Sequence, residues 1–98
     1  MATLQAPQYG QNTDIDSGAA EVLTTDTIRV AYGTEIKALA ANGSNYVYVG
    51  ITDDVSATTG WQLAAGDSIF VSVREAQYAG DIYVIGSADN QKVCWRAI

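Results

Sequence analysis

The side chains that most often carry out enzymatic chemistry are scarce in this sequence. It contains no histidine and a single cysteine, Cys94. Histidine is the commonest general base near neutral pH and the commonest metal ligand, so neither a Ser-His-Asp nor a Cys-His arrangement can be assembled from this chain. Cys94 stands between Val93 and Trp95, which favours a packed thiol over a reactive nucleophile. These residues predict a protein that is not an enzyme.

The acidic residues offer a second kind of chemistry, because two carboxylates can hydrolyse a glycosidic bond. Most of the eleven acidic residues, however, fall in turns or at strand ends, where turn chemistry explains them: Asp53, Asp54, Asp67, Asp81 and Asp89. The pair Asp53-Asp54 could contribute to a weak calcium site, which needs roughly six or more oxygen ligands. We therefore predict no catalytic, cofactor-binding or metal-ligating residue.

Aromatic side chains are the more promising functional residues. The chain has six tyrosines and two tryptophans, and exposed rings stack on sugars or anchor protein interfaces. Tyr46 and Tyr48 share one face of a strand opposite Val47 and Val49, so they form an outward patch if the valines fill the core. Burial of most rings in the core is the alternative. The residues that we predict at an interface with another protein subunit are Leu4, Pro7, Tyr9, Tyr46, Tyr48 and Trp61.

From about residue 20 onward, short apolar runs with strand-like alternation are separated by turn residues. No stretch has apolar positions at helical spacing. The Asn42-Gly43 dipeptide predicts a hairpin between two of the strands. We expect an all-β fold, a single β-sandwich of jelly-roll or Ig-like type over residues 21–98. The expected strands are 21–25, 27–32, 35–40, 46–51, 61–63, 68–74, 82–85 and 92–98.

Residues 1–20 differ from the rest of the chain. They hold several glutamines and the only proline, Pro7, and show neither a helical nor an alternating pattern. We predict an extended N-terminal arm, which Leu4, Pro7 and Tyr9 would anchor to a neighbouring subunit. A solvated tail is the alternative.

The length, net charge and composition of the chain limit the classes of partner. A chain of 98 residues is one domain with a thin core, which an oligomer or a larger partner would stabilise. Its net charge of -6 and its five dispersed basic residues argue against nucleic acid and anionic membranes. No apolar run approaches the roughly 18 residues of a membrane span, and the N-terminus lacks the features of a secretion signal. With one cysteine, the chain suits a reducing cytoplasm.

Three segments resemble small β-sandwich virion proteins of tailed bacteriophages. They are Asn-Gly-Ser-Asn-Tyr-Val-Tyr-Val-Gly (42–50), Thr-Thr-Gly-Trp-Gln-Leu-Ala-Ala-Gly-Asp-Ser-Ile (58–69) and Ile-Tyr-Val-Ile-Gly-Ser (82–87). The resemblance covers roughly residues 20–98. It implies a head decoration, or cement, protein made in the host cytoplasm and located on the capsid surface of the virion.

Such a protein would bind the major capsid protein, most simply as a homotrimer, and would stabilise the assembled shell by mass action. A fibre-associated, tail-associated or receptor-binding component of the same kind of virion is the first alternative. A carbohydrate-binding β-sandwich outside viruses is the second.

Overall fold

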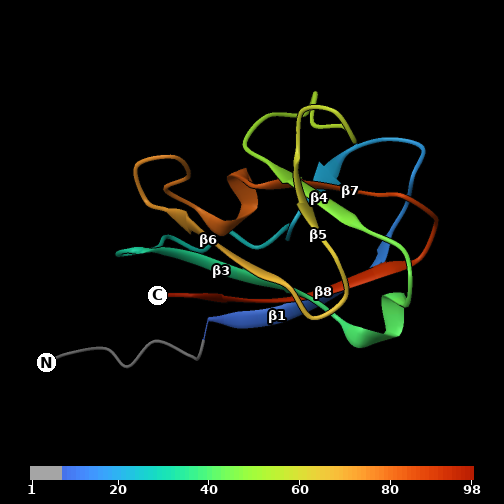
Figure 1. Cartoon of the computed structure of the whole chain (residues 1–98). Coiled ribbons are helices and arrows are strands. Elements are labelled where there is room, and N and C mark those ends of the chain that lie inside the picture. The colour runs from blue at the N-terminus through green and yellow to red at the C-terminus, as the bar shows by residue number, and fades with distance from the viewer. Residues whose placement is uncertain (1–7) are drawn as a thin grey trace, which may run out of the picture.

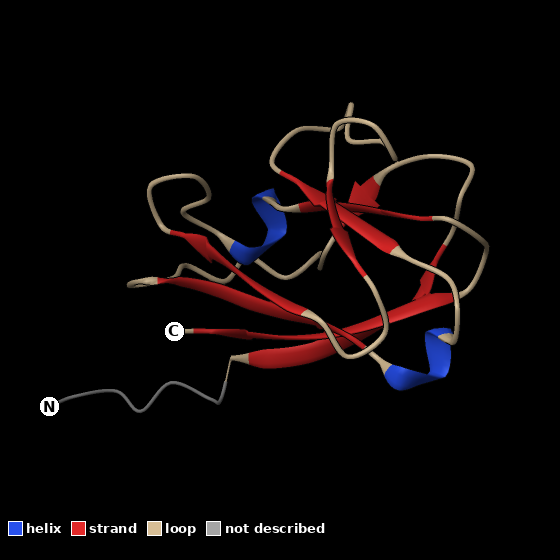
Figure 2. Cartoon of the chain, viewed as in Figure 1, coloured by secondary structure: helices blue, strands red, loops and turns tan. Residues whose placement is uncertain are grey.

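The computed structural model describes residues 8–98, which form two four-stranded antiparallel sheets that face each other (Figure 1). The strand order is β1-β8-β3-β6 in the first sheet and β2-β7-β4-β5 in the second. The strands are β1 (Tyr9–Ile15), β2 (Glu21–Val22), β3 (Gly33–Ala38), β4 (Val47–Gly50), β5 (Trp61–Leu63), β6 (Ser68–Ser72), β7 (Tyr83–Gly86) and β8 (Gln91–Ala97). Among the described residues, the helical content is limited to two short 3-10 helices, η1 (Ala40–Asn42) and η2 (Ala79–Asp81), seen in Figure 2. The prediction of an all-β chain is confirmed.

The core lies between the two sheets. Ile36 and Val93 from the first sheet and Val47 and Val84 from the second are completely buried and belong to one apolar cluster. The alternation that predicted the last strand is present in β8, where Val93 and Trp95 face this cluster. Within residues 8–98, no helix has the length and apolar character needed to cross a bilayer.

The structure differs from the predicted arm over residues 1–20 because Tyr9–Ile15 is a strand of the first sheet. β1 pairs with β8 in antiparallel register, with Gly10 opposite Trp95 and Asn12 opposite Val93. The two inward residues, Gly10 and Asn12, are not apolar side chains, so the segment shows no apolar alternation. Only Ile15, at the end of the strand, is a buried apolar residue. The predicted anchors Leu4 and Pro7 lie outside the described residues.

The chain after β1 is also held in place. The Gly86 N–H donates to the Asp16 carbonyl oxygen at 3.0 Å, and the Asn90 N–H donates to the Asp16 carboxylate at 3.1 Å. The Ser17 hydroxyl donates to the Asp89 carboxylate at 3.1 Å. Residues 16–17 are therefore tied to the turn between β7 and β8.

The predicted hairpin at Asn42-Gly43 is wrong. β3 and β4 belong to different sheets, and the chain passes between them through η1. Gly43 has a φ of 62°, so the dipeptide does form a turn with a left-handed residue, but this turn changes sheets. The buried Asn42 side chain fixes it, because its amide donates to the Lys92 carbonyl and accepts from the Lys92 N–H, both at 2.8 Å.

The strand predicted over residues 27–32 is reduced to one isolated bridge between Arg29 and Tyr78. Val30 is buried as its alternation predicted, and its N–H donates to Gln77 at 3.0 Å. The backbone N–H groups of residues 31–33 then converge on the carbonyl of Ile98, which breaks the regular ladder. The segment is a connection with a buried side chain rather than a strand.

Candidate binding surface

The outer surface of the first sheet brings four distant parts of the chain into register. Tyr9 on β1 lies opposite Arg96 on β8, and Arg96 lies opposite Glu35 on β3. Glu35 in turn lies opposite Phe70 on β6, so the row crosses the whole sheet. The next outward row contains Gln11, Cys94, Lys37 and Ser68. We call these two rows the outer face of the first sheet.

The first row has an aromatic ring at each end and an ion pair in the middle. Tyr9 is 67% exposed and Phe70 is 49% exposed. The Arg96 Nε atom lies 2.8 Å from the Glu35 Oε1 atom. The Arg96 and Glu35 side chains are 64% and 40% exposed, so the pair contributes no more than about 1 kcal/mol to stability. Its effect on the surface is to neutralise the charge between the two rings.

Phe70 is held in place although half of it is exposed. Its ring lies over Gly33 on the neighbouring strand, where a Cβ atom would stand 2.5 Å from the Phe70 Cζ atom and 2.3 Å from the Val71 carbonyl oxygen. An aromatic ring that covers a strand glycine from the adjacent strand stabilises that position. The ring therefore needs little ordering when a partner packs against it.

A shallow hollow of about 500 Å³ lies on the β1 side of this face, and its lining mixes apolar, charged and amide side chains. The lining residues are Tyr9, Gly10, Gln11, Glu35, Lys37, Cys94, Trp95 and Arg96. Gly10 leaves room for the indole of Trp95, since a Cβ atom there would stand 3.0 Å from the Trp95 Cζ2 atom. Within residues 8–98, no group of three or more His, Cys, Asp or Glu side chains could hold a metal ion.

The predicted interface residues do not gather in one place. Tyr9 lies on the outer face of the first sheet, whereas Trp61 is in β5 of the second sheet. Tyr46 and Tyr48 lie on the second-sheet side, with ring centroids 6.4 Å apart. Val47 and Val49 fill the core as expected, but Tyr48 is only 7% exposed. The structure thus does not combine Tyr9 with the other three aromatic residues.

Tyr48 is covered by the loop over residues 51–60, which folds back on β4. A Cβ atom on Gly60 would stand 2.8 Å from the Tyr48 Cβ atom and 2.6 Å from the Val55 Cγ2 atom. The loop can approach β4 this closely because residue 60 is a glycine and has no side chain. The outward patch that the sequence predicted is therefore reduced to Tyr46, which is 36% exposed.

Phe70 and the ion pair between Arg96 and Glu35 are surface residues that the sequence analysis did not select. The alternation in residues 68–74 does place Phe70 opposite the buried Val71, which marks it as an outward ring. Nothing in the sequence shows that β6 lies two strands away from β8, so the row could not be predicted.

Glu21 on β2 is a carboxyl group whose pKa is displaced from its ordinary value. Burial raises the pKa of Glu21, and the negative charges of Asp16 and Asp14 raise it further. A hydrogen bond from the Asp16 backbone acts in the opposite direction. The group lies at the β2 edge of the second sheet, away from the outer face of the first sheet.

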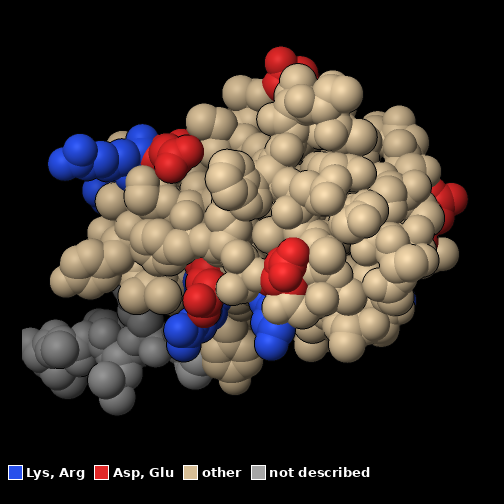
Figure 3. Space-filling model, viewed as in Figure 1, with Lys and Arg blue, Asp and Glu red and all other residues tan. Residues whose placement is uncertain are grey.

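The fold and this surface define a class of all-β protein with two facing sheets, one of which carries an outer row with an exposed aromatic ring at each end. Comparisons with protein-family models, curated proteins and solved structures found no match to this chain. The charged side chains in view in Figure 3 are few and scattered over an otherwise uncharged surface.

Proposed function

We propose that this protein is a jelly-roll module of a bacteriophage virion that decorates and stabilises the assembled capsid. The strand order carries the proposal. β1 pairs with β8, β2 with β7, β3 with β6 and β4 with β5. A ribbon of four such pairs wrapped around a core is a jelly roll, an architecture found in viral capsid and lectin domains.

The segments that resemble phage virion proteins occupy a coherent part of the fold. Residues 42–50 include β4, residues 58–69 include β5 and the start of β6, and residues 82–87 include β7. Three of the four strands of the second sheet thus carry the resemblance. This clustering in one sheet supports the proposal that the resemblance reflects a fold shared with those virion proteins.

The outer face of the first sheet is the proposed contact with the major capsid protein. Exposed aromatic rings such as Tyr9 and Phe70 are favourable anchors at protein interfaces. A module that binds the assembled shell but not its free subunits stabilises the shell, by about 2.7 kcal/mol per site at a hundred times the Kd. Three copies around a symmetry axis add avidity without any further contact. No catalytic group takes part in this function.

The experiment is co-sedimentation with heads of the phage that encodes the chain. We expect the protein to pellet with assembled heads and to stay in solution with dissociated capsid protein. Tyr9→Ser should weaken binding about tenfold or more, whereas the matched control Tyr46→Ser on the second sheet should bind like the wild type. Pelleting with tails, or no pelleting with either fraction, would contradict the proposal. Sedimentation velocity of the free protein tests the expected homotrimer.

A further inference from the structure

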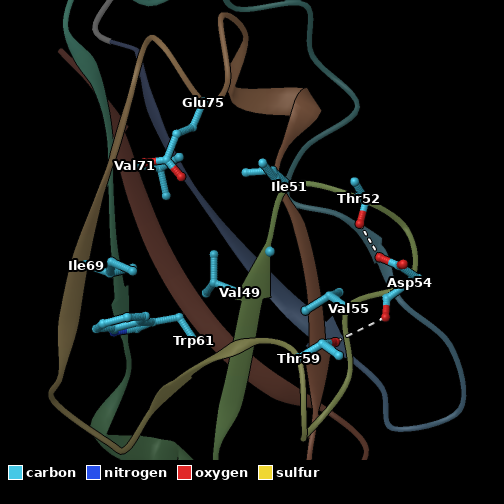
Figure 4. A pocket seen from close by; sticks show the side chains of 11 residues that line it. Val49, Ile51, Thr52, Asp54, Val55, Thr59, Trp61, Ile69, Val71 and Glu75 are labelled. Atoms are coloured by element: carbon cyan, nitrogen blue, oxygen red, sulfur yellow. Dashed lines mark hydrogen bonds between the residues drawn. The ribbon is translucent and has the colours of Figure 1, made fainter.

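A groove opens between the last strands of the two sheets, on the side opposite β1. β5 and β6 are these last strands, and the groove has a volume of about 260 Å³. Trp61 pairs with Val49, so both side chains lie on the face of the second sheet that is turned toward the first. Figure 4 shows Val49 and Val71 pointing into the space between the sheets, with Trp61 and Ile69 at one end and Thr52 and Asp54 on the loop across from them.

One part of this groove is apolar. Val49 and Val71 form its floor and are 4% and 5% exposed, because they belong to the core. Trp61 forms a wall and is 65% exposed, which is unusual for an indole that points toward the core side of its sheet. An exposed apolar surface with a polar rim is typical of a binding site.

The rim of the groove is acidic. Glu75 is exposed and its carboxylate makes no hydrogen bond or ion pair within residues 8–98, and Asp54 lines the groove as well. The hydroxyl groups on the rim are already used, since Thr52 donates to the Asp54 carboxylate and Thr59 donates to the Asp54 carbonyl oxygen. The lining includes no lysine or arginine. The rim therefore offers hydrogen-bond acceptors and negative charge.

We propose that this groove binds a lysine or arginine side chain of a partner polypeptide. Such a side chain has an apolar stem that can lie along Val49 and Val71 and a cationic head that can reach Glu75. The Trp61 indole, at the opposite end of the groove from Glu75 in Figure 4, offers further apolar surface to the stem. The head group has only donors to offer, which matches a rim whose unused groups are acceptors.

Other ligands fit this chemistry less well. A phosphate or carboxylate would meet two carboxylates and no basic residue, in a chain of net charge -6. A neutral sugar has hydroxyl groups that both donate and accept, so it also needs donors from the protein; both threonine hydroxyls donate within the loop, which leaves the Trp61 indole N–H as the one side-chain donor among the lining residues. Charge complementarity thus favours a basic side chain. This inference does not depend on whether the outer face of the first sheet contacts a capsid.

The experiment is an NMR titration of the whole chain with the peptide acetyl-Gly-Arg-Gly-amide. We expect saturable shifts of the Trp61 indole N–H and the Val49 and Val71 methyl signals, with the Trp95 indole unchanged. The matched peptide with citrulline in place of arginine keeps the shape but lacks the charge. It should bind about tenfold more weakly or worse, because hydrogen bonds to charged groups are roughly twice as strong as neutral ones.

Two variants complete the test. Glu75→Gln should weaken binding of the arginine peptide about tenfold. Asp53→Asn removes a neighbouring charge that does not line the groove and should leave binding unchanged; both exposed positions tolerate the change, which the free-protein spectra verify. Equal binding of the two peptides, or no shift with either, would overturn the proposal. Shifts produced by maltotriose but not by the arginine peptide would assign the groove to a sugar and overturn it too.

Discussion

Ile15 offers a direct test of the position of β1. It is completely buried at the end of a segment that is otherwise polar, and it belongs to the same core cluster as Ile36 and Val93. If residues 9–15 were an arm lying outside the domain, shortening this side chain would have little effect on folding. In the structure, Ile15→Ala leaves a cavity between the sheets.

The expected loss is large for a domain of this size. Truncating a buried isoleucine to alanine costs about 2–5 kcal/mol, and the whole domain is stable by about 5–15 kcal/mol. Each kcal/mol lowers the Tm of such a domain by roughly 4–8 °C, so a loss of about 3 kcal/mol lowers it by roughly 12–24 °C. Circular dichroism during heating and urea unfolding with an unchanged m-value are the measurements.

Thr13→Ala is the matched control, because Thr13 lies in the same strand and is exposed. It should change the free energy of unfolding by no more than about 0.5 kcal/mol. An Ile15→Ala protein that unfolds at the same temperature as this control would refute the placement of β1 in the core.

Three further substitutions test other parts of the account. Asn42→Ala leaves the Lys92 N–H and carbonyl without their buried partner and should cost about 2 kcal/mol or more in urea unfolding, so a loss below about 0.5 kcal/mol would contradict the sheet-to-sheet turn. Gly33→Ala forces a Cβ atom against backbone and should lower the free energy of unfolding by about 1–3 kcal/mol, whereas Gly18→Ala, which meets nothing within 4 Å, should not. Because burial and neighbouring carboxylates raise the pKa of Glu21 above its ordinary value, the folded state binds the proton more tightly than the unfolded state. The stability that this group contributes is therefore lost as the pH rises from 4.5 through the folded pKa. Glu21→Gln should raise the Tm at pH 7 and make the fall in Tm between pH 4 and pH 7 smaller than in the wild type. A variant whose Tm falls by the same amount as that of the wild type between these two pH values would contradict the prediction.

The parts of the fold that the sequence predicts well are strands with one apolar face. In β8 the buried Val93 and Trp95 alternate with outward residues, and β6 shows the same pattern around Val71. β1 has glycine and asparagine at its inward positions, so its place in the sheet depends on backbone hydrogen bonds with β8. Backbone pairing of this kind produces no alternation of apolar and polar residues, and the sequence therefore gives no sign of the strand.

Long-range pairing is the other limit. Asn42-Gly43 forms the turn that its residues favour, but a turn does not determine whether the next strand pairs with the preceding one or joins the facing sheet. For the same reason the sequence identified Tyr9 and Trp61 as candidates but could not place them on different sheets. The row from Tyr9 to Phe70 and the groove beside Trp61 can be recognised only when the strand order is known.

Electron cryomicroscopy of heads incubated with the protein tests the proposed function most directly. We predict ordered density on the capsid exterior into which the two-sheet domain fits with Tyr9, Arg96, Glu35 and Phe70 turned toward the shell. Bare heads at saturating protein, or bound domains that present this row to solvent, would contradict the account.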